Sequence, residues 1–489
     1  MKAYTYYLLK GFEKVNAFLK NDILEKIRDF CISEKFMLIM LAIACVITVF
    51  HIEIAGVFIF IFIEYFLLIV CEDLLATTLP FLLLSETLIK CYGSYNVFIH
   101  YVWLAIPVVG ALIFHFVYYR KKLVLGKCFL PMLFVSVSVT LGGVGFLSFK
   151  EYFNLAAFYY IFGLGFGMLL IYVLLNSYLN TPRKYSMKSK ITDIMLYMGI
   201  FAVFMIFEFY LTNIPEVIHE KGIIYMQWRN NISTFLIFAI PFAAFKAVKK
   251  PSFILLSLLF YLSILLTGSS GGLIFGFIEL MMAISVLIGI DRRHRWTYIA
   301  IGGGIVAAVT LFVQDFYGFF GATFDRLIMG ISGGEKEVRV QLFERAFEDF
   351  YHNPVFGTGL SYMGNRDVHP SAEFALCWYH CEPLQIMASL GLIGIAAYAI
   401  QAIQRLILFL KKRTIFNITV LISYLGIEMM SLVNPGIFCP IPYLFLVTMF
   451  MSIVEINNST DDTLSIGDDV DKNQLVEAMS DMDDEDDDE

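Results

Sequence analysis

Charged residues are scarce in this chain. Only 16% of its 489 residues are Asp, Glu, Lys or Arg, and 59% are hydrophobic. Soluble domains carry about 25% charged residues. So little charge excludes a string of soluble domains, although the length alone would allow several. The composition predicts an all-α, polytopic integral membrane protein, because apolar helices are the usual way for such a chain to cross a bilayer.

Positive charge is almost absent from the last segment. Residues 456–489 hold fourteen acids and one lysine, so the rest of the chain carries about five more positive than negative charges despite the net charge of −8. A block of like charges has little to bury, which predicts a disordered acidic tail on the cytoplasmic side. An acidic tail gives no reason to expect nucleic acid as a partner.

Metal-binding spacings are also lacking. The eight cysteines are scattered, and only Cys377 and Cys381 share a loop, where a disulfide would be strained and two free thiols are favoured. His369, Glu373 and His380 add ligand chemistry to the same loop, but no paired CxxC or HExxH spacing occurs. We therefore expect no metal and no cofactor, with a metal site as the minor alternative.

Long apolar runs recur along the chain, and they predict 12–14 transmembrane helices. The third run is interrupted by Glu86 and Lys90, so a short or re-entrant segment with the two side chains paired across one helix turn is an alternative. The predicted spans are 36–51, 55–71, 75–91, 97–118, 127–147, 155–178, 192–211, 231–246, 252–267, 271–290, 296–313, 384–409, 417–434 and 438–455.

The basic residues predict how these spans are oriented. With fourteen spans, every basic cluster between them falls on the side of both termini, which the positive-inside rule makes cytoplasmic. Residues 1–35 read as an amphipathic helix on the cytoplasmic membrane surface. The predicted organisation is this segment, a first membrane domain at 36–313, a large extracytoplasmic loop at 314–383, three last spans at 384–455 and the tail.

The large loop contains one clear helical pattern. "VRVQLFERAFEDFYHNP" predicts an amphipathic helix with Val340, Phe343, Ala346, Phe347 and Phe350 on one side. The "GTGL" that follows predicts a tight turn. Loops of this length without structure are uncommon in compact proteins, so we expect this loop to fold and to carry function.

Three further polar segments lie at predicted external ends of spans. "YMQWRNN" places Trp228 and Arg229 before a span, which is also typical of interfacial anchoring. "LLTGSSGGLIFG" predicts either close helix packing or a nest of backbone N–H groups that binds an anion. "YHCEPLQIMASLGLIG" places His380 beside Pro383 at a wet membrane rim, where a neutral imidazole suits proton transfer.

Together these segments resemble the O-antigen ligases and O-antigen polymerases. "RVQLFERAFEDFYHNPVFGTGL" is similar to the family segment with an arginine, a tryptophan four residues later, a proline and a Gly-x-Gly turn; here Arg339 and Pro354 match and Phe343 replaces the tryptophan. The two segments upstream of this one and the histidine segment downstream of it also resemble family segments and occur in the family's order. Together the four segments cover roughly residues 220–400. Ser270 stands where the family usually has an arginine, and Cys381 where it has asparagine or serine.

The resemblance implies a membrane glycosyltransferase that moves a glycan from a polyprenyl-diphosphate carrier to an acceptor hydroxyl, without a metal and with inversion. His380 would be the general base, and Arg339 would hold the diphosphate. Arg229 or Arg366 would replace the arginine missing at Ser270. The supporting residues expected around them are Trp228, Ser269, Ser270, Glu382 and Gln385.

Two other classes of protein remain open. A transporter or flippase of lipid-linked glycans would suit fourteen spans, although no internal repeat is visible and the polar candidates lie on one face. Glu208, Glu428 and Asn434 are possible intramembrane sites, but each is more typical of a cap or anchor. A scaffold that signals through the acidic tail is the third possibility.

For the enzyme, the sequence favours a surface polysaccharide polymerase or a related assembly step over a ligase. The expected location is the cytoplasmic membrane. The expected partners are the lipid-linked donor, a glycan or lipid acceptor and a possible chain-length regulator.

Overall fold

The chain forms two compact units. The computed structural model describes residues 21–91, 97–98, 100–143, 156–181, 183–220, 224, 226–311, 331–332, 335–336, 338–360, 379–434 and 436–459. Unit 1 comprises Met1–Lys122 and Tyr197–Asn213, and unit 2 comprises Leu123–Leu196 and Ile214–Glu489. The acidic tail from 460 on, most of the 314–383 loop and the first twenty residues lie outside the described residues.

Unit 1 is built from helices, and those that follow the charged α2 are mostly apolar. A side-chain cap starts each of its first two: Asn21 accepts a hydrogen bond from the N–H of Ile23, and Ser33 from that of Phe36. The α4 helix contacts α5 and α7. The helices of unit 1 are α2 (Asp22–Ile32), α3 (Glu34–Val49), α4 (Glu53–Val70), α5 (Leu75–Lys90), η2 (Val102–Leu104), α7 (Ala105–Tyr118) and the second part of α11 (Met187–Thr212).

Unit 2 contains the remaining helices and one two-stranded antiparallel sheet, in which Ile331 pairs with Lys336. These elements are α8 (Phe129–Gly143), α9 (Ala156–Leu164), α10 (Phe166–Leu179), the first part of α11, α12 (Ile214–Glu220), α13 (Arg229–Ala247), η4 (Pro251–Phe253), α14 (Ile254–Thr267), α15 (Ser270–Ile290), α16 (Arg295–Leu311), β1 (Ile331–Ser332), β2 (Glu335–Lys336), α18 (Val338–His352), α19 (Glu382–Leu410), α20 (Ile415–Met430), η5 (Gly436–Phe438), η6 (Pro440–Leu444) and α21 (Phe445–Ser459).

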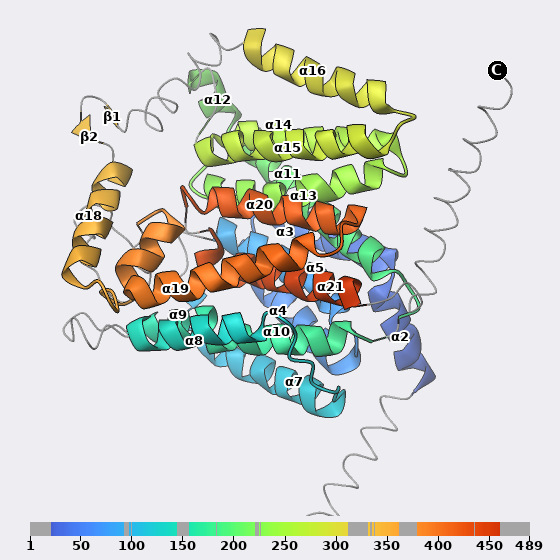
Figure 1. The fold of residues 1–489 in the computed structure, drawn as a ribbon. Coiled ribbons are helices and arrows are strands. Elements are labelled where there is room, and N and C mark those ends of the chain that lie inside the picture. Colours follow the sequence, from blue (N-terminus) through green and yellow to red (C-terminus); the bar gives the residue numbers. More distant parts are fainter. Residues whose placement is uncertain are drawn as a thin grey trace, which may run out of the picture. The chain divides into compact units, whose positions relative to one another are not determined.

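Within unit 2, α13 lies at the centre of a helical layer. It contacts α14, α15 and α20, while α19 contacts α8 and α18 (Figure 1). Aromatic residues form the core beside α13: Phe238 and Phe242 are fully buried, and the ring of each lies close to that of Phe450 on α21, with centroid distances of 5.9 and 5.6 Å. Such aromatic contacts hold the bundle together through burial and favourable ring geometry.

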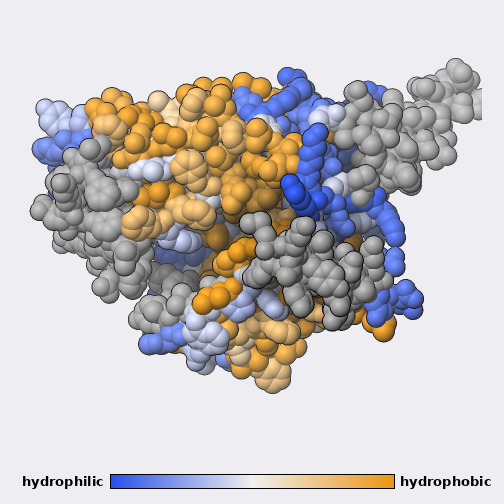
Figure 2. All heavy atoms as spheres, turned by 90° about the horizontal axis from the view of Figure 1, so that it is seen from below, coloured by the Kyte–Doolittle hydropathy of each residue, from blue (hydrophilic) through white to orange (hydrophobic). Residues whose placement is uncertain are grey.

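The helices confirm an all-α, multi-pass membrane protein. A helix occupies each of the fourteen predicted spans. Within the part of the chain that the structure describes, seven helices are long and apolar enough to cross a membrane, or eight if the bent pair α2 and α3 counts as one span. Helices of 14–17 residues extend only about 21–26 Å, less than the ~30 Å apolar thickness, so the count of 12–14 stays a prediction. Broad hydrophobic areas lie on the surface (Figure 2).

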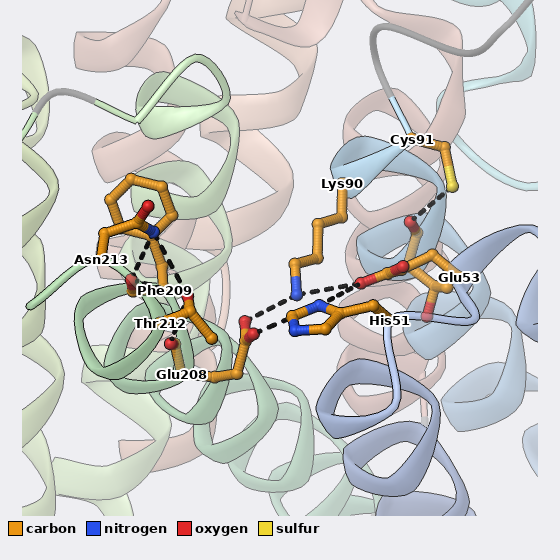
Figure 3. Close-up of polar contacts among 9 residues, drawn as sticks. His51, Glu53, Lys90, Cys91, Glu208, Phe209, Thr212 and Asn213 are labelled. Carbon is orange, nitrogen blue, oxygen red and sulfur yellow. Dashed lines mark hydrogen bonds and ion pairs between the residues drawn. The ribbon is translucent and has the colours of Figure 1, made fainter.

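The predicted pairing of Glu86 with Lys90 is wrong. In unit 1 the Lys90 ammonium lies 3.0 Å from the Glu53 carboxylate and 2.6 Å from that of Glu208 (Figure 3). His51 completes this ionic cluster, with Nδ1 3.5 Å from Glu208 Oε1. Glu86 is fully buried one helix turn before Lys90, so a pairing across helices replaced the local one.

Candidate active site

The start of α19 places His380 in an unusual backbone conformation. Cys381 is the N-cap residue with an extended backbone, and its carbonyl accepts a hydrogen bond from the N–H of Gln385 at 2.8 Å. Pro383 follows within the first turn, a position that suits proline because its missing N–H has no helical partner there. His380 is half-buried and has a φ of +53°, in the left-handed region. A histidine rarely takes this conformation without support from its surroundings.

Tyr379 supplies such support on the other side of His380. It is 1% exposed, and its hydroxyl donates to Asp349 Oδ2 at 2.6 Å. Its backbone N–H donates to Gln385 Oε1 at 3.0 Å, and Gln385 Nε2 donates to Ser389 Oγ at 3.0 Å. These four residues form the Tyr379 network. It joins α18 to the segment that carries His380.

The helix α19 is broken at Gly391, where φ is +65° and ψ is −160° (Figure 1). The chain of the predicted "GTGL" turn fills the break: the N–H of Thr358 donates to the Ala388 carbonyl at 2.9 Å, and that of Gly359 to the Ser389 carbonyl at 3.0 Å. On the other side of the break, the N–H of Leu392 donates to the Pro354 carbonyl at 2.8 Å. The backbone groups released by the break thus find partners in the turn.

The helix α18 carries Arg339 in its first turn. Leu342, Ala346 and Asp349 form its buried side, and Ala346 packs with Tyr379 in the apolar cluster. The predicted apolar side was wrong in part, because Phe347 is 58% exposed. Arg339 itself is half-buried. The helix α18 buries the side that faces α19, and an apolar residue on its other side can remain exposed.

The two upstream segments meet at one amide cluster, formed by Asn230, Ser269 and Asn434. Ser269 Oγ donates to Asn230 Oδ1 at 2.8 Å, and Asn230 Nδ2 donates to Asn434 Oδ1 at 3.2 Å. Trp228 is the buried N-cap residue of α13, which begins at Arg229, so both predicted residues lie directly before Asn230. The cluster brings the ends of α13, α15 and α20 together.

The end of α20 connects this cluster to the histidine segment. The N–H of Glu382 donates to the Ser431 carbonyl at 2.8 Å, and Ser431 is the C-cap residue of α20, three residues before Asn434. Glu382 is 5% exposed. Three sequence segments that are far apart in the chain are therefore gathered around residues 431–434. The carbonyls, amides and hydroxyls found there are groups that bind sugar hydroxyls or phosphate oxygens.

The anion nest, which was one of two alternatives for the start of α15, is partly occupied by the helix's own cap. Ser269 Oγ accepts from the N–H of Gly272 at 3.2 Å, which removes one of the free N–H groups. Ser270 is the first helical residue and is half-buried. Arg366, the other proposed substitute for the family arginine, lies outside the described residues. Sequence reasoning did not identify Asp349, Tyr379 or Asn230, although all three lie in or beside quoted motifs.

The thiol and metal chemistry of the site is limited. Burial raises the pKa of the Cys381 thiol, with a smaller contribution from the nearby carboxyl of Glu382. Cys381 is a free thiol, as predicted, while Cys377 lies outside the described residues. Among the residues that the structure describes, no group of three His, Cys, Asp or Glu side chains is arranged to hold a metal ion.

Fold and site together define a multi-pass, all-α membrane protein with a polar centre where the ends of α13, α15, α19 and α20 meet. Residues 254–399 match the family model described as O-Antigen ligase. The match contains Ser269, Arg339 and His380, and it confirms the resemblance for this segment. This segment of the chain is therefore similar to the O-antigen ligase family. No curated protein and no solved structure matches the chain significantly.

Proposed function

We propose that this protein is a glycosyltransferase that moves a glycan from a polyprenyl-diphosphate carrier to an acceptor hydroxyl. The observation that carries the proposal is the position of His380, fixed in a left-handed turn directly before a membrane helix, within the segment that matches the O-antigen ligase family. A base at that rim meets a sugar in water while the carrier's lipid stays in the bilayer.

In the proposed reaction the acceptor oxygen attacks the anomeric carbon of the donor sugar, and the bond from that carbon to the diphosphate oxygen breaks. His380 takes the hydroxyl proton, because the hydroxyl is the weak nucleophile. The diphosphate leaves with additional negative charge and needs cations more than a proton. Arg339 supplies one cation, and Arg229 or Arg366 supplies the second in place of the arginine missing at Ser270.

The amide cluster would orient the substrate. Asn230, Ser269 and Asn434 present amide and hydroxyl groups beside Arg229, and Glu382 and Gln385 begin the helix behind His380. Polar uncharged groups at a membrane rim suit the recognition of sugar hydroxyls. We propose that a polymerase and a ligase of this type would differ in the acceptor that they bind. We favour a polymerase or a related assembly step. It would act at the outer face of the cytoplasmic membrane, and both termini of the chain would be cytoplasmic.

The decisive variant is His380→Asn. Asparagine tolerates the left-handed backbone conformation but cannot act as the base, so the fold should persist while transfer is lost. We expect surface glycan to be short or absent and lipid-linked units to accumulate on the outer face. His352→Asn, at an exposed histidine on α18, is the matched control and should leave surface glycan unchanged.

Normal glycan length and yield in the His380→Asn strain would refute the assignment of the base. The second candidate function is a flippase of lipid-linked glycans, and the break in α19 favours it because transporters use discontinuous helices. Accumulation of lipid-linked units only on the cytoplasmic face would support the flippase and exclude the transferase.

A further inference from the structure

We infer that Asp349 and Tyr379 are positioning residues that fix His380 relative to α18, the helix carrying Arg339. This inference rests on the proposed function and deepens it. The hydrogen bond between Tyr379 of the histidine segment and Asp349 of α18 would set the distance between the base, His380, and Arg339, which binds the diphosphate.

The bond is short and buried. Tyr379 is 1% exposed and Asp349 is 6% exposed, and the phenol hydroxyl lies 2.6 Å from the carboxylate oxygen. Tyr379 also packs in an apolar cluster with Ala346 of α18 and Ala388 of α19. A hydrogen bond to a carboxylate in such surroundings is stronger and more directional than one between neutral groups in water.

The same tyrosine is fixed at its backbone. Its N–H donates to the Gln385 side chain at 3.0 Å, and that side chain donates in turn to Ser389 on the next turn of α19. Tyr379 is therefore held at the ring end by α18 and at the backbone end by α19. His380 follows it directly and has a φ of +53°, a conformation that needs such support.

The helix α18 extends this constraint to Arg339. Ten residues separate Arg339 from Asp349, a helical distance of about 15 Å. A helix keeps its length, so fixing Asp349 to Tyr379 also fixes Arg339 with respect to His380. An enzyme that must hold a leaving group and a base at a set separation depends on such positioning, and an error of 1 Å can lower the rate about 100-fold.

The test compares the two partners of the bond in the purified full-length protein. The donor is the lipid-linked glycan extracted from the His380→Asn strain. For Tyr379→Phe and Asp349→Leu we expect kcat to fall about 10- to 100-fold while KM for the donor changes less than twofold. Asp349→Asn keeps an acceptor oxygen for the tyrosine and should retain most of the activity. Tyr351→Phe on α18, where the tyrosine is 81% exposed, is the matched control.

The double variant Tyr379→Phe with Asp349→Leu separates positioning from folding. It replaces both ends of this hydrogen bond, so neither the phenol nor the carboxylate is buried opposite an apolar substitute, and its thermal unfolding midpoint should recover towards that of the original protein. Its kcat should stay as low as that of either single variant, because both changes remove one bond. Recovery of kcat together with stability would overturn the inference, as would additive losses in kcat.

The inference and the proposed function fail in different ways. If His380→Asn abolishes transfer while Tyr379→Phe and Asp349→Leu both keep normal kcat, the positioning role is wrong and the glycosyltransferase assignment stands. If His380→Asn keeps normal transfer, the assignment of the base is wrong and the inference falls with it.

Discussion

Gly391 should be the residue at which a single methyl group most clearly disturbs the site. Its φ of +65° and ψ of −160° lie in a region that essentially only glycine adopts. A Cβ built there would lie 2.5 Å from the carbonyl carbon and oxygen of Val355 and 2.7 Å from the N of Gly357. These are backbone atoms, so no side-chain rotation can relieve the overlap.

The cost of Gly391→Ala has two sources. Backbone strain of this kind costs about 1–3 kcal/mol. Overpacking against fixed atoms costs about 1–3 kcal/mol more. The combined loss of about 2–6 kcal/mol is comparable to a large part of a domain's stability. We expect the turn at 354–359 to separate from the broken helix and the protein to unfold at a lower temperature.

The assay is the thermal unfolding midpoint of the purified protein, measured together with surface glycan. Gly303→Ala in α16 is the control, because a Cβ there meets nothing within 4 Å and helical alanine should stabilise by about 0.5–1 kcal/mol. An unchanged midpoint and normal glycan for Gly391→Ala would refute the account of the break in α19, since a continuous helix would accept alanine readily.

Three further predictions concern the rest of the molecule. Lys90→Met leaves two carboxylates of the ionic cluster without the lysine cation and should destabilise the protein by about 3 kcal/mol. Lys121→Met removes a more exposed ion pair and should cost less than about 1 kcal/mol. Equal shifts of the unfolding midpoint in the two variants would contradict this prediction. The raised pKa of Cys381 leaves less thiolate at pH 7, so its alkylation by maleimide should be slower than that of free cysteine. The alkylation rate should increase as the pH rises above 9. A rate equal to that of free cysteine at pH 7 would disprove the burial of this thiol. Gly426→Ala would place a Cβ 2.5 Å from Glu279 Oε1 and should destabilise the protein by about 1–3 kcal/mol. Adding Glu279→Ala should restore part of the lost stability. If the double variant is no more stable than Gly426→Ala alone, the clash does not lie at Glu279.

Local chemistry alone let the sequence predict much of the site's framework. Pro383 predicted where α19 begins, because proline lacks the N–H that a helix interior needs, and the helix starts at Glu382. "GTGL" predicted a tight turn, and Gly357 and Gly359 both have positive φ. These are properties of single residues and their neighbours, so no distant contact was needed to predict them.

The partners of polar groups were not predictable in the same way. The spacing of Lys90 and Glu86 suggested, as one alternative, a pair across one helix turn, yet the Lys90 ammonium pairs with carboxylates from two other helices. Inside a membrane protein a charge binds to whichever opposite charge the packing brings near, and sequence spacing does not reveal this. Asp349 is likewise absent from the apolar side predicted for its amphipathic helix, although it is buried against Tyr379.

The amino-acid sequence by itself determined the class of protein: its scarce charge and long apolar runs fixed an all-α membrane protein, and its ordered motifs indicated the O-antigen ligase-like segment. Only the tertiary structure decided that α19 breaks at Gly391, that the amide cluster joins three helix ends, and that Tyr379 ties the histidine segment to α18. Periodicity and propensity act over one or two helix turns, whereas these features depend on residues brought together from distant parts of the chain.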